Sequence, residues 1–348
     1  MTSPIPVTVL GATGLVGQRF VRRLAGHPWF SIAHLVASER SAGLRYAEAC
    51  TWRAGGPPHA GWGETRLEAI DEPRQATPVV FSALESELAR DVEPAFARQG
   101  SLVFSNASAW RMEKDIPLLV PEVNPRAIEL LDRQKSLRDW SGGIVTNPNC
   151  VTAILSLPLA ALHRARGLAA VRVSTFQALS GAGARGLFAL DALDNVIPHI
   201  LGEASKISAE MSKILAFEDE KDGPVISASC HRVPVGNGHG MDVSLAFRGA
   251  TPTVDEASRL LATFRGDDVL GGLPTSPSPP LRVHGLPDRP QHVLDLSDTD
   301  MTVHVGNLEP CPVMGLKLYA LGHNLERGAA GGSLLNAELA RAMGYIRS

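Results

Sequence analysis

Short apolar runs alternate with longer amphipathic segments over the first 150 residues of the chain. Five runs have the length and composition of buried strands: Val7–Leu10, Ser31–Ala37, Thr77–Ser82, Ser101–Ser105 and Ile144–Thr146. Helix-like segments such as Ser86–Arg98 lie between them, and a glycine-containing turn follows the first run. Strands that alternate with helices in this way predict an α/β fold built on a doubly wound parallel sheet.

The pattern changes after residue 150, where strand-like runs are grouped. These runs are Val171–Ala178, Val225–Arg232, Met241–Arg248, Met301–Val305 and Leu316–Leu321. Helical segments are expected around 185–217 and 254–264, Gly271–Pro280 is a proline-rich loop, and Gly331–Tyr345 predicts a final amphipathic helix. The grouping predicts a mixed or antiparallel sheet in a second, α+β domain.

Composition excludes several classes of protein. The 348 residues carry a net charge of −3 and no basic cluster, which argues against a nucleic-acid binder. No apolar run reaches the roughly 18 residues of a membrane span, and no basic stretch marks a signal peptide. The four cysteines, Cys50, Cys150, Cys230 and Cys311, include no CxxC pair, so neither a disulfide framework nor a metal site is expected. We therefore expect a cytoplasmic protein without membrane or nucleic-acid partners.

A glycine motif follows the first predicted strand. Its three glycines are spaced three apart and open the next helix, a variant of the dinucleotide-binding pattern. Such glycines allow a tight turn and close approach to a pyrophosphate, which the helix N-terminus favours. An ordinary strand-to-helix turn is the alternative. The residues expected to bind the cofactor here are Gly11, Thr13, Gly14, Leu15, Val16 and Gly17.

The segment after the second predicted strand favours NADP over NAD. Arg40 lies between the hydroxyls of Ser38 and Ser41, and all three can bind a 2′-phosphate. Glu39 could instead serve the ribose hydroxyl of NAD, and a solvated loop of mixed charge is the other reading.

Cys150 is the candidate nucleophile, because it ends the sequence Asn147-Pro-Asn-Cys150 between a strand and a helix. A helix N-terminus stabilises a thiolate and can hold an oxyanion. The other three cysteines are expected to be buried apolar filler, and a thiol-directed label is expected to reach Cys150 first.

A cysteine nucleophile needs a base, and two histidines are candidates. His231 lies within a predicted strand, whereas His239 follows a glycine loop that can approach another site, so His239 is preferred. Arg232 could hold a carboxylate with two hydrogen bonds.

These motifs together resemble the aspartate-β-semialdehyde dehydrogenases, in the branch typified by archaeal and fungal enzymes. The resemblance rests on segments found in order along nearly the whole chain: Gly11–Gly17, Ser38–Gly43, Ser105–Arg111, Pro148–Cys150, Gln177–Gly183, Asn195–Pro198, Gly202–Glu203, Arg232–Val235 with His239, and His323–Leu325. The chain departs from the branch at Leu44, where a lysine is usual, and at Glu203-Ala-Ser-Lys206, where a run of acids is usual.

The resemblance implies a Rossmann-like NADP-binding domain, residues 1–149 with 331–348, and a catalytic and dimerisation domain, residues 150–330, in a homodimer or homotetramer. It implies reversible reduction of aspartyl-β-phosphate to aspartate-β-semialdehyde, with loss of phosphate, in the biosynthesis of lysine, threonine and methionine. The implied roles are Cys150 as nucleophile, His239 as acid/base, Gln177 orienting the acyl group, Arg232 and Glu203 binding the substrate carboxylate and ammonium, Arg111 and Lys206 binding phosphate, Asn106 in the substrate site, and Ser180, Gly181 and Asn324 at the cofactor.

Three other functions remain open from the sequence. A malonyl-CoA reductase resembles this branch and shares the cysteine and the nucleotide site, but its substrate has no amine. Acetylglutamyl-phosphate reductases use similar chemistry, although the Arg232–Val235 context fits them poorly. A catalytically silent NADP-binding regulator is the remaining alternative, and the intact set of Cys150, Gln177, Arg232 and His239 argues against it.

Overall fold

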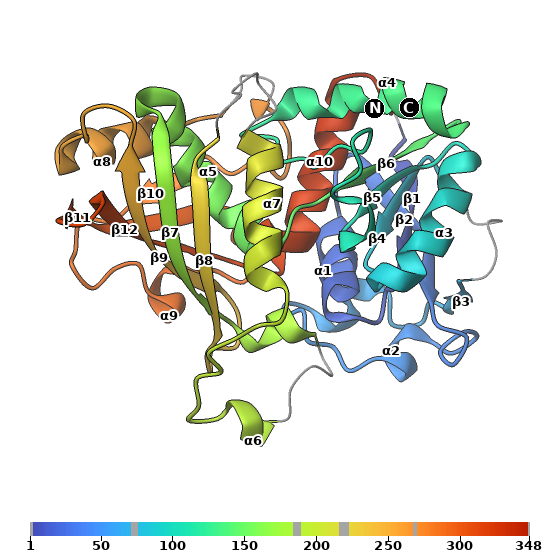
Figure 1. Ribbon diagram of the computed structural model, residues 1–348. Coiled ribbons are helices and arrows are strands. Elements are labelled where there is room, and N and C mark those ends of the chain that lie inside the picture. Colours follow the sequence, from blue (N-terminus) through green and yellow to red (C-terminus); the bar gives the residue numbers. More distant parts are fainter. Residues whose placement is uncertain (1–2, 71–75, 184–188, 216–222, 267–269, 347–348) are drawn as a thin grey trace.

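The structure, a computed structural model, describes residues 3–70, 76–183, 189–215, 223–266 and 270–346. Two β-sheets lie side by side, each with its own helices (Figure 1). The chain builds the first sheet, crosses to the second, and returns to the first with its last helix. The predicted α/β fold with a doubly wound parallel sheet and a second mixed sheet is confirmed.

The first sheet is parallel, with strand order β3-β2-β1-β4-β5-β6. Its strands are β1 (Ile5–Leu10), β2 (Phe30–Ala37), β3 (Glu68–Ala69), β4 (Val79–Ser82), β5 (Leu102–Ser105) and β6 (Gly143–Thr146). The last residues of β1, β4, β5 and β6 stand in register. The segments that follow these strands therefore leave from one edge of the sheet, where ligands bind in folds of this kind.

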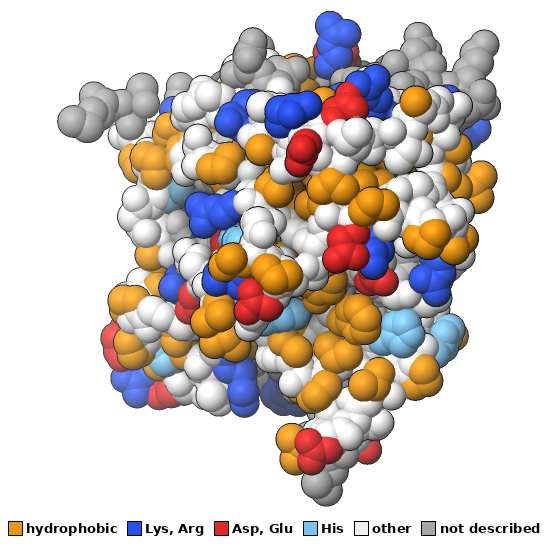
Figure 2. Space-filling model, turned by 90° about the vertical axis from the view of Figure 1, so that its left-hand side faces the viewer, with side chains coloured by type: hydrophobic (Ala, Val, Ile, Leu, Met, Phe, Trp, Pro, Cys, Tyr) orange, Lys and Arg blue, Asp and Glu red, His pale blue; other side chains and the backbone are white. Residues whose placement is uncertain are grey.

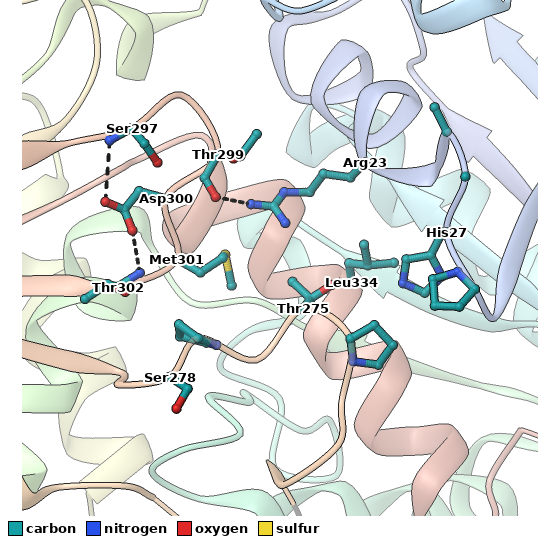
Figure 3. A pocket seen from close by; sticks show the side chains of 15 residues that line it. Arg23, His27, Thr275, Ser278, Ser297, Thr299, Asp300, Met301, Thr302 and Leu334 are labelled. Carbon is teal, nitrogen blue, oxygen red and sulfur yellow. Dashed lines mark hydrogen bonds between the residues drawn. The ribbon is translucent and has the colours of Figure 1, made fainter.

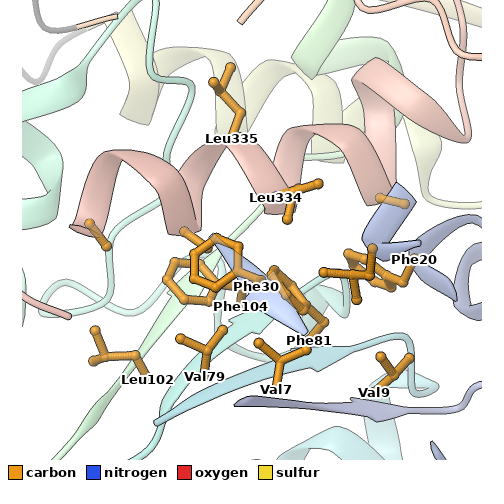
Figure 4. Packing of buried hydrophobic residues seen from close by; sticks show 14 of the residues in the cluster. Val7, Val9, Phe20, Phe30, Val79, Phe81, Leu102, Phe104, Leu334 and Leu335 are labelled. Atoms are coloured by element: carbon orange, nitrogen blue, oxygen red, sulfur yellow. The ribbon is translucent and has the colours of Figure 1, made fainter. Parts of the chain in front are cut away.

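Helices cover both faces of this sheet because every second side chain of each strand faces one of two apolar clusters. The helices of this half are α1 (Leu15–Leu24), α2 (Tyr46–Ala49), α3 (Ser86–Arg98), α4 (Leu130–Arg138) and α10 (Gly331–Ala342). On one face Phe30, Phe81 and Phe104 pack against α1 and against α10, where Leu334 lies on their side of the helix (Figure 4). On the other face a separate cluster contains residues of α3.

The last helix differs from the amphipathic helix expected over Gly331–Tyr345. It ends at Ala342, and all of its residues from 331 to 340 are buried. Its polar side chains face other buried groups instead of water: Ser333 donates to Asn106, and the Asn336 amide donates to Asn147. The polar face of this helix contacts other parts of the protein and not water. Periodicity along one segment cannot distinguish these two environments.

The second sheet is mixed, with strand order β10-β11-β12-β9-β7-β8. Its strands are β7 (Leu168–Gln177), β8 (Val225–Arg232), β9 (His239–Phe247), β10 (Leu281–Val283), β11 (Val303–Cys311) and β12 (Gly315–Gly322). The helices are α5 (Cys150–Arg166), α6 (Ala189–Ala192), α7 (Glu203–Leu215), α8 (Val254–Thr263) and α9 (His292–Asp295). Residues of α5, α7 and α8 share one apolar cluster with this sheet.

These clusters support the division of the chain into residues 1–149 with 331–348, and 150–330, which we keep as a proposal. Residues of α10 belong to the cluster of the parallel sheet, whereas residues of α5 belong to that of the mixed sheet. The boundary at residue 150 thus separates β6 from the helix that begins at Cys150.

The helix expected around 185–217 is interrupted. Two of its parts, 185–188 and 216–217, lie outside the described residues, and the described helices are α6 and α7. Between them Ile197 pairs with Arg232 of β8 through two backbone hydrogen bonds of 3.0 and 2.9 Å, and Pro198 follows. Strand-like pairing replaces the helix because the residue before a proline disfavours helical backbone angles.

The outermost strands β3 and β10 were not predicted, because two or three residues carry too little periodicity to be recognised. Among the described residues, no helix is long and apolar enough to span a membrane.

Replacing Leu335 by alanine should destabilise the protein by about 2–5 kcal/mol, because its side chain on α10 is fully buried in the apolar cluster of this half of the molecule. Urea unfolding followed by tryptophan fluorescence measures the loss. The matched control is Leu137→Ala, since Leu137 is 61% exposed and its truncation should change stability by no more than about 0.5 kcal/mol. Equal effects of the two substitutions would contradict the buried position of α10.

Candidate active site

The junction between β6 and α5 positions Cys150 at the first turn of a helix. Asn149 caps this helix, and its side-chain oxygen accepts the Val151 N–H at 2.9 Å. Asn147 is held by three contacts: its amide donates to Ala329 O and to Asn106 Oδ1, and its oxygen accepts from Asn336. The Asn147–Cys150 motif is therefore a turn whose two asparagine side chains are fixed by hydrogen bonds, and these bonds position the cysteine.

His239, the first residue of β9, brings its Nε2 atom to 3.1 Å from Cys150 Sγ. Its Nδ1 accepts the backbone N–H of Ala178 at 3.0 Å. A backbone N–H can only donate, so Nδ1 carries no proton and the proton of the neutral ring is on Nε2. Burial and the nearby Arg232 lower the pKa of His239 to about 3, which keeps the ring neutral. Nε2–H is thus a hydrogen-bond donor to the sulfur.

His231, the other candidate base, is directed elsewhere. It lies on β8, where its Nδ1 is 3.1 Å from Thr175 O and its ring stacks on Phe176. Only His239 of these two histidines is hydrogen-bonded to Cys150.

The charges around Cys150 oppose the stabilisation of the thiolate that its helix position led us to expect. Desolvation and, after it, the charge of Glu203 raise the pKa of the Cys150 thiol to about 12. Arg111, Arg232 and the Val151 N–H act in the opposite direction without balancing this effect. In this arrangement the thiol is protonated at neutral pH.

The other cysteines also differ in part from expectation. Cys230 is buried as expected, but Cys50 and Cys311 are partly exposed. Backbone N–H groups of Val313 and Met314 lower the pKa of Cys311. That a label reaches Cys150 first stays a prediction, and the lowered pKa of Cys311 makes it the competing thiol in the absence of substrate.

Glu203 lies between two other predicted site residues. It is the first residue of α7, is 8% exposed, and accepts from Asn149 Nδ2 at 2.7 Å and from Gln177 Nε2 at 3.3 Å. Arg232 is also buried, and its Nη1 donates to Ala178 O at 2.7 Å. A carboxylate and a guanidinium thus flank the cysteine, as a substrate with an ammonium and a carboxylate would require.

Arg111 approaches the same corner from the segment after β5. Its Nη1 is 2.9 Å from Glu210 Oε1, its Nη2 donates to Asn106 O at 2.7 Å, and its buried Nε has no hydrogen-bond partner. Lys206, expected beside it, is different: its side chain is exposed on α7, and its ammonium makes no hydrogen bond or ion pair among the described residues.

The glycine motif forms the turn that the sequence predicts. Gly11 has φ of +76°, and a Cβ added at Gly17 would lie 2.8 Å from Ala12 Cα, so a larger residue does not fit there. The helix begins at Leu15 without a side-chain cap and without an acid in its first turn. Its first N–H groups are therefore available to an anion.

Arg40 and Ser38 are exposed beside this turn, in a loop that ends at Gly43. The Ser41 N–H donates to Ser38 O at 2.8 Å, which places both hydroxyl residues and Arg40 on one tight turn. The Arg66 guanidinium donates to Gly43 O at 2.7 Å. Sequence reasoning did not single out Arg66, because 23 residues separate it from the carbonyl that it contacts.

Ser180, Gly181 and Asn324, which are expected at the cofactor, lie close to His239. Asn324 accepts from the Gly238 N–H at 2.8 Å and donates to Ser180 Oγ at 2.9 Å. A Cβ added at Gly181 would lie 3.2 Å from His239 Nε2.

Besides Arg66, three contributors to the site were not recognised from the sequence. Asn149 belonged to the motif, but its contacts with Glu203 and Glu210 appear only in the structure. Glu210 lies two helical turns after Glu203, a spacing that places both on one face and could have indicated it. Gly328 lies in a short π-helix, η8 (Glu326–Ala330), where an added Cβ would be 2.5 Å from the Cβ of Cys150.

A cavity of about 480 Å³ lies apart from these residues, between the end of α1 and the loops around residues 274–278 and 297–302 (Figure 3). None of the site residues named above lines it. The charged groups in its wall already have partners: Arg23 contacts Glu326 and Thr299, His27 contacts Glu338, and Asp300 accepts from Thr302. We assign no function to this cavity.

One group in the described part of the chain has the composition of a metal site, namely His284, Asp295 and His304. Its atoms already have protein partners. His284 Nε2 is 3.0 Å from His304 Nδ1, and both oxygens of Asp295 accept from Arg289. The cluster is read as a hydrogen-bonded network.

Comparisons with known proteins agree with this geometry. Residues 6–131 match the model of the semialdehyde dehydrogenase NAD binding domain, and residues 159–327 match that of the semialdehyde dehydrogenase dimerisation domain. The aspartate-semialdehyde dehydrogenase of Archaeoglobus fulgidus is 45% identical over 96% of this chain and 97% of its own. That of Cryptococcus neoformans is 41% identical over 99% and 98%.

The chain belongs to the aspartate-semialdehyde dehydrogenase family. The solved aspartate-semialdehyde dehydrogenase of Candida albicans with NADP is 35% identical, covers 99% of this chain and 100% of its own, and superposes with a TM-score of 0.88. The enzyme II of Vibrio cholerae, complexed with ASA, is 26% identical over 98% of this chain and 99% of its own, with a TM-score of 0.79. The predicted resemblance to the archaeal and fungal branch is confirmed, and these aspartate-semialdehyde dehydrogenases give no support to the malonyl-CoA reductase alternative.

Glu203→Gln should make Cys150 more reactive in the absence of substrate. The change removes the negative charge that raises the pKa of the thiol, so the thiolate fraction at a given pH increases and the pH profile of alkylation shifts to lower pH. Iodoacetamide labelling at several pH values, with peptide mapping, measures the rate at Cys150. Cys50 is the internal control, because burial and not Glu203 raises the pKa of its thiol. A slower or unchanged rate at Cys150 would contradict this electrostatic role.

Proposed function

We propose that this aspartate-semialdehyde dehydrogenase reduces aspartyl-β-phosphate to aspartate-β-semialdehyde, reversibly and with NADPH, in the biosynthesis of lysine, threonine and methionine. The observation that carries the proposal is the 3.1 Å contact between Cys150 Sγ and His239 Nε2, with Glu203 and Arg232 buried beside it. A non-catalytic regulator would have no use for a nucleophile with these neighbours.

Recognition of the substrate follows from the charges around the cysteine. Arg232 binds the α-carboxylate, because a guanidinium can hold a carboxylate with two hydrogen bonds and only one of its amino groups contacts Ala178 O. Glu203 binds the α-ammonium. Arg111 binds the phosphate, and the support for this role is its buried Nε, which has no hydrogen-bond partner. Asn106 contacts Arg111, because its backbone oxygen accepts from Nη2. Lys206 is kept as a second phosphate contact, although no contact of its side chain supports that role.

Substrate binding itself activates the cysteine in this mechanism. An ammonium at Glu203 neutralises the charge that raises the pKa of Cys150, so the thiolate becomes accessible when the substrate arrives. The Nε2–H of His239 then stabilises the thiolate by a hydrogen bond. The sulfur attacks the acyl carbon, the bond to phosphate breaks, and the proton of the thiol leaves with the phosphate, which stays at Arg111. Gln177 orients the carbonyl of the thioester.

Reduction of the thioester completes the reaction, with NADPH supplying the hydride. Addition to the carbonyl gives an alkoxide, which forms the aldehyde by expelling the Cys150 thiolate. This step needs no net proton transfer, and the Nε2–H of His239 is placed to stabilise the negative charge as it moves from oxygen to sulfur. Acid/base transfer by His239, as the family resemblance implies, requires the ring to give up its contact with the Ala178 N–H.

The residues present fit NADP. The uncapped start of α1 and the turn at Gly11 suit a pyrophosphate, and the Ser38–Ser41 turn suits a 2′-phosphate with Arg40 as its cation. The rest of the pyrophosphate site consists of Thr13, Gly14, Leu15, Val16 and Gly17. The wall beside the nicotinamide consists of Ser180, Gly181 and Asn324.

A homodimer is proposed for the assembly, with a homotetramer as its extension. Large hydrophobic side chains with high exposure are concentrated in the half that carries the mixed sheet, where Leu201, Val293 and Val313 are 88, 91 and 88% exposed. From the side of this half, Figure 2 shows hydrophobic side chains gathered between charged ones. Such surface is typical of protein interfaces, and the matching family model is that of a dimerisation domain. Light scattering of the purified protein measures its mass in solution, which distinguishes a monomer, a dimer and a tetramer.

A cytoplasmic location is proposed, because all four cysteines are free thiols and a reducing compartment preserves them. The small-molecule substrate and cofactor account for the site without a nucleic-acid or membrane partner.

Cys150→Ala should lower turnover by at least about 10³-fold, because no thioester can form. NADP should still bind with unchanged affinity, since the glycine turn and the Ser38–Ser41 turn lie on other segments. The assay is phosphate-dependent reduction of NADP by aspartate semialdehyde, with NADP binding followed by fluorescence titration. Appreciable turnover by the alanine variant would overturn the covalent mechanism.

Arg40→Ala should raise KM for NADP by roughly 10- to 150-fold, the effect of losing a hydrogen bond to a charged group. KM for NAD should hardly change, because NAD lacks the 2′-phosphate. Arg45→Ala is a matched control: Arg45 is paired with Glu48 and Glu64 and is not proposed to contact the cofactor. Equal loss with NADP and NAD would indicate a damaged loop and would reject the specific contact.

A further inference from the structure

Glu210 is a buried carboxylate with two fixed partners. It lies on α7, is 2% exposed, and its Oε1 is 2.9 Å from Arg111 Nη1. Its Oε2 accepts the backbone N–H of Asn149, the residue before Cys150. The carboxylate therefore connects the arginine proposed to bind phosphate with the backbone that positions the nucleophile.

Arg111 has N–H donors left for a further acceptor. Nη1 is used by Glu210 and Nη2 by Asn106 O, whereas the buried Nε–H has no partner. Arg111 is 8% exposed, and an unpaired N–H in such a position is costly unless a ligand accepts from it. An oxygen of the substrate phosphate meets this requirement.

We propose that Glu210 competes with the substrate phosphate for Arg111 and thereby sets how tightly the site holds phosphate. The inference rests on the proposed function, in which Arg111 binds this group. Phosphate must share the guanidinium with the carboxylate, because the Asn149 N–H holds the other carboxylate oxygen and prevents Glu210 from turning away. Two negative groups on one cation repel each other, so the phosphate is bound less tightly than Arg111 alone would bind it.

This competition has a consequence for the reaction. The phosphate is a leaving group in the reductive direction, and tight retention by a buried arginine would slow its departure. Glu210 keeps Arg111 oriented between turnovers and weakens its hold on the product. The ammonium of Lys213 donates to three carbonyls, those of Arg111, Glu113 and Ile116, so it is not free to bind the phosphate itself.

Glu210→Gln should lower KM for phosphate by about three-fold or more in the phosphate-dependent reduction of NADP by aspartate semialdehyde. KM for aspartate semialdehyde and for NADP should remain close to the original values. A gain in phosphate affinity is a readout that mere loss of structure cannot produce. The matched control is Glu113→Gln, which removes a carboxylate two residues from Arg111 that pairs with Arg138 instead; its KM for phosphate should not change.

Arg111→Lys separates failure of this inference from failure of the site assignment. If KM for phosphate rises in this variant and falls in E210Q, competition is supported. If it rises in the lysine variant but is unchanged or higher in E210Q, the competition is rejected while the phosphate site stands. An unchanged KM in the lysine variant rejects Arg111 as the phosphate contact and the competition with it.

Glu210→Asp provides a second variant should the glutamine protein not fold. It keeps the charge but withdraws it from Arg111 by one methylene group, so it should lower KM for phosphate less than E210Q does. Titration of the folded variants with inorganic phosphate, followed by thermal shift, should give the same order of affinity. The reverse order would overturn the proposal.

Discussion

Asn149 holds together the corner on which the whole site depends. Its side-chain oxygen caps α5 through the Val151 N–H, its amide donates to Glu203, and its backbone N–H donates to Glu210. All three contacts are buried, where an unpaired polar group would be costly. The two acids of α7 are therefore fixed relative to the first turn of α5, and the cysteine that follows Asn149 has one position.

One of these acids also acts on the reactivity of the cysteine. Burial and the charge of Glu203 raise the pKa of Cys150, whereas Arg111 and Arg232 lower it. In the absence of substrate the thiol is protonated, which protects a nucleophile from oxidation and adventitious reaction. Under the proposed function, an ammonium at Glu203 removes the charge that opposes the thiolate, and malonyl substrates, which have no amine, lack this cation.

Sequence reasoning succeeded where one local signal determines the outcome. The predicted helix Ser86–Arg98 and strand Val225–Arg232 coincide with α3 and β8. It failed where contact with a distant segment determines the local structure. An amphipathic helix is expected at α10, but residues 331–340 are all buried. The helix expected around 185–217 is interrupted where Ile197 pairs with Arg232. Sequence reasoning also gave no sign of the backbone N–H contacts that lower the pKa of Cys311, because they come from a turn that periodicity does not describe.

The sequence by itself determined which groups are available and in which local setting: the glycine turn, the cysteine at the start of a helix, the Ser38–Ser41 turn and the candidate residues around them. These are properties of neighbouring residues, because backbone angles and helix termini act over a few positions. The tertiary structure alone decided that His239, 89 residues away, faces the cysteine with Nε2–H, and that Glu210 holds both Arg111 and Asn149. Such contacts arise where two sheets and α7 meet, and the energies that settle them are those of burying and pairing charges, which depend on distances in space and not on separation along the chain.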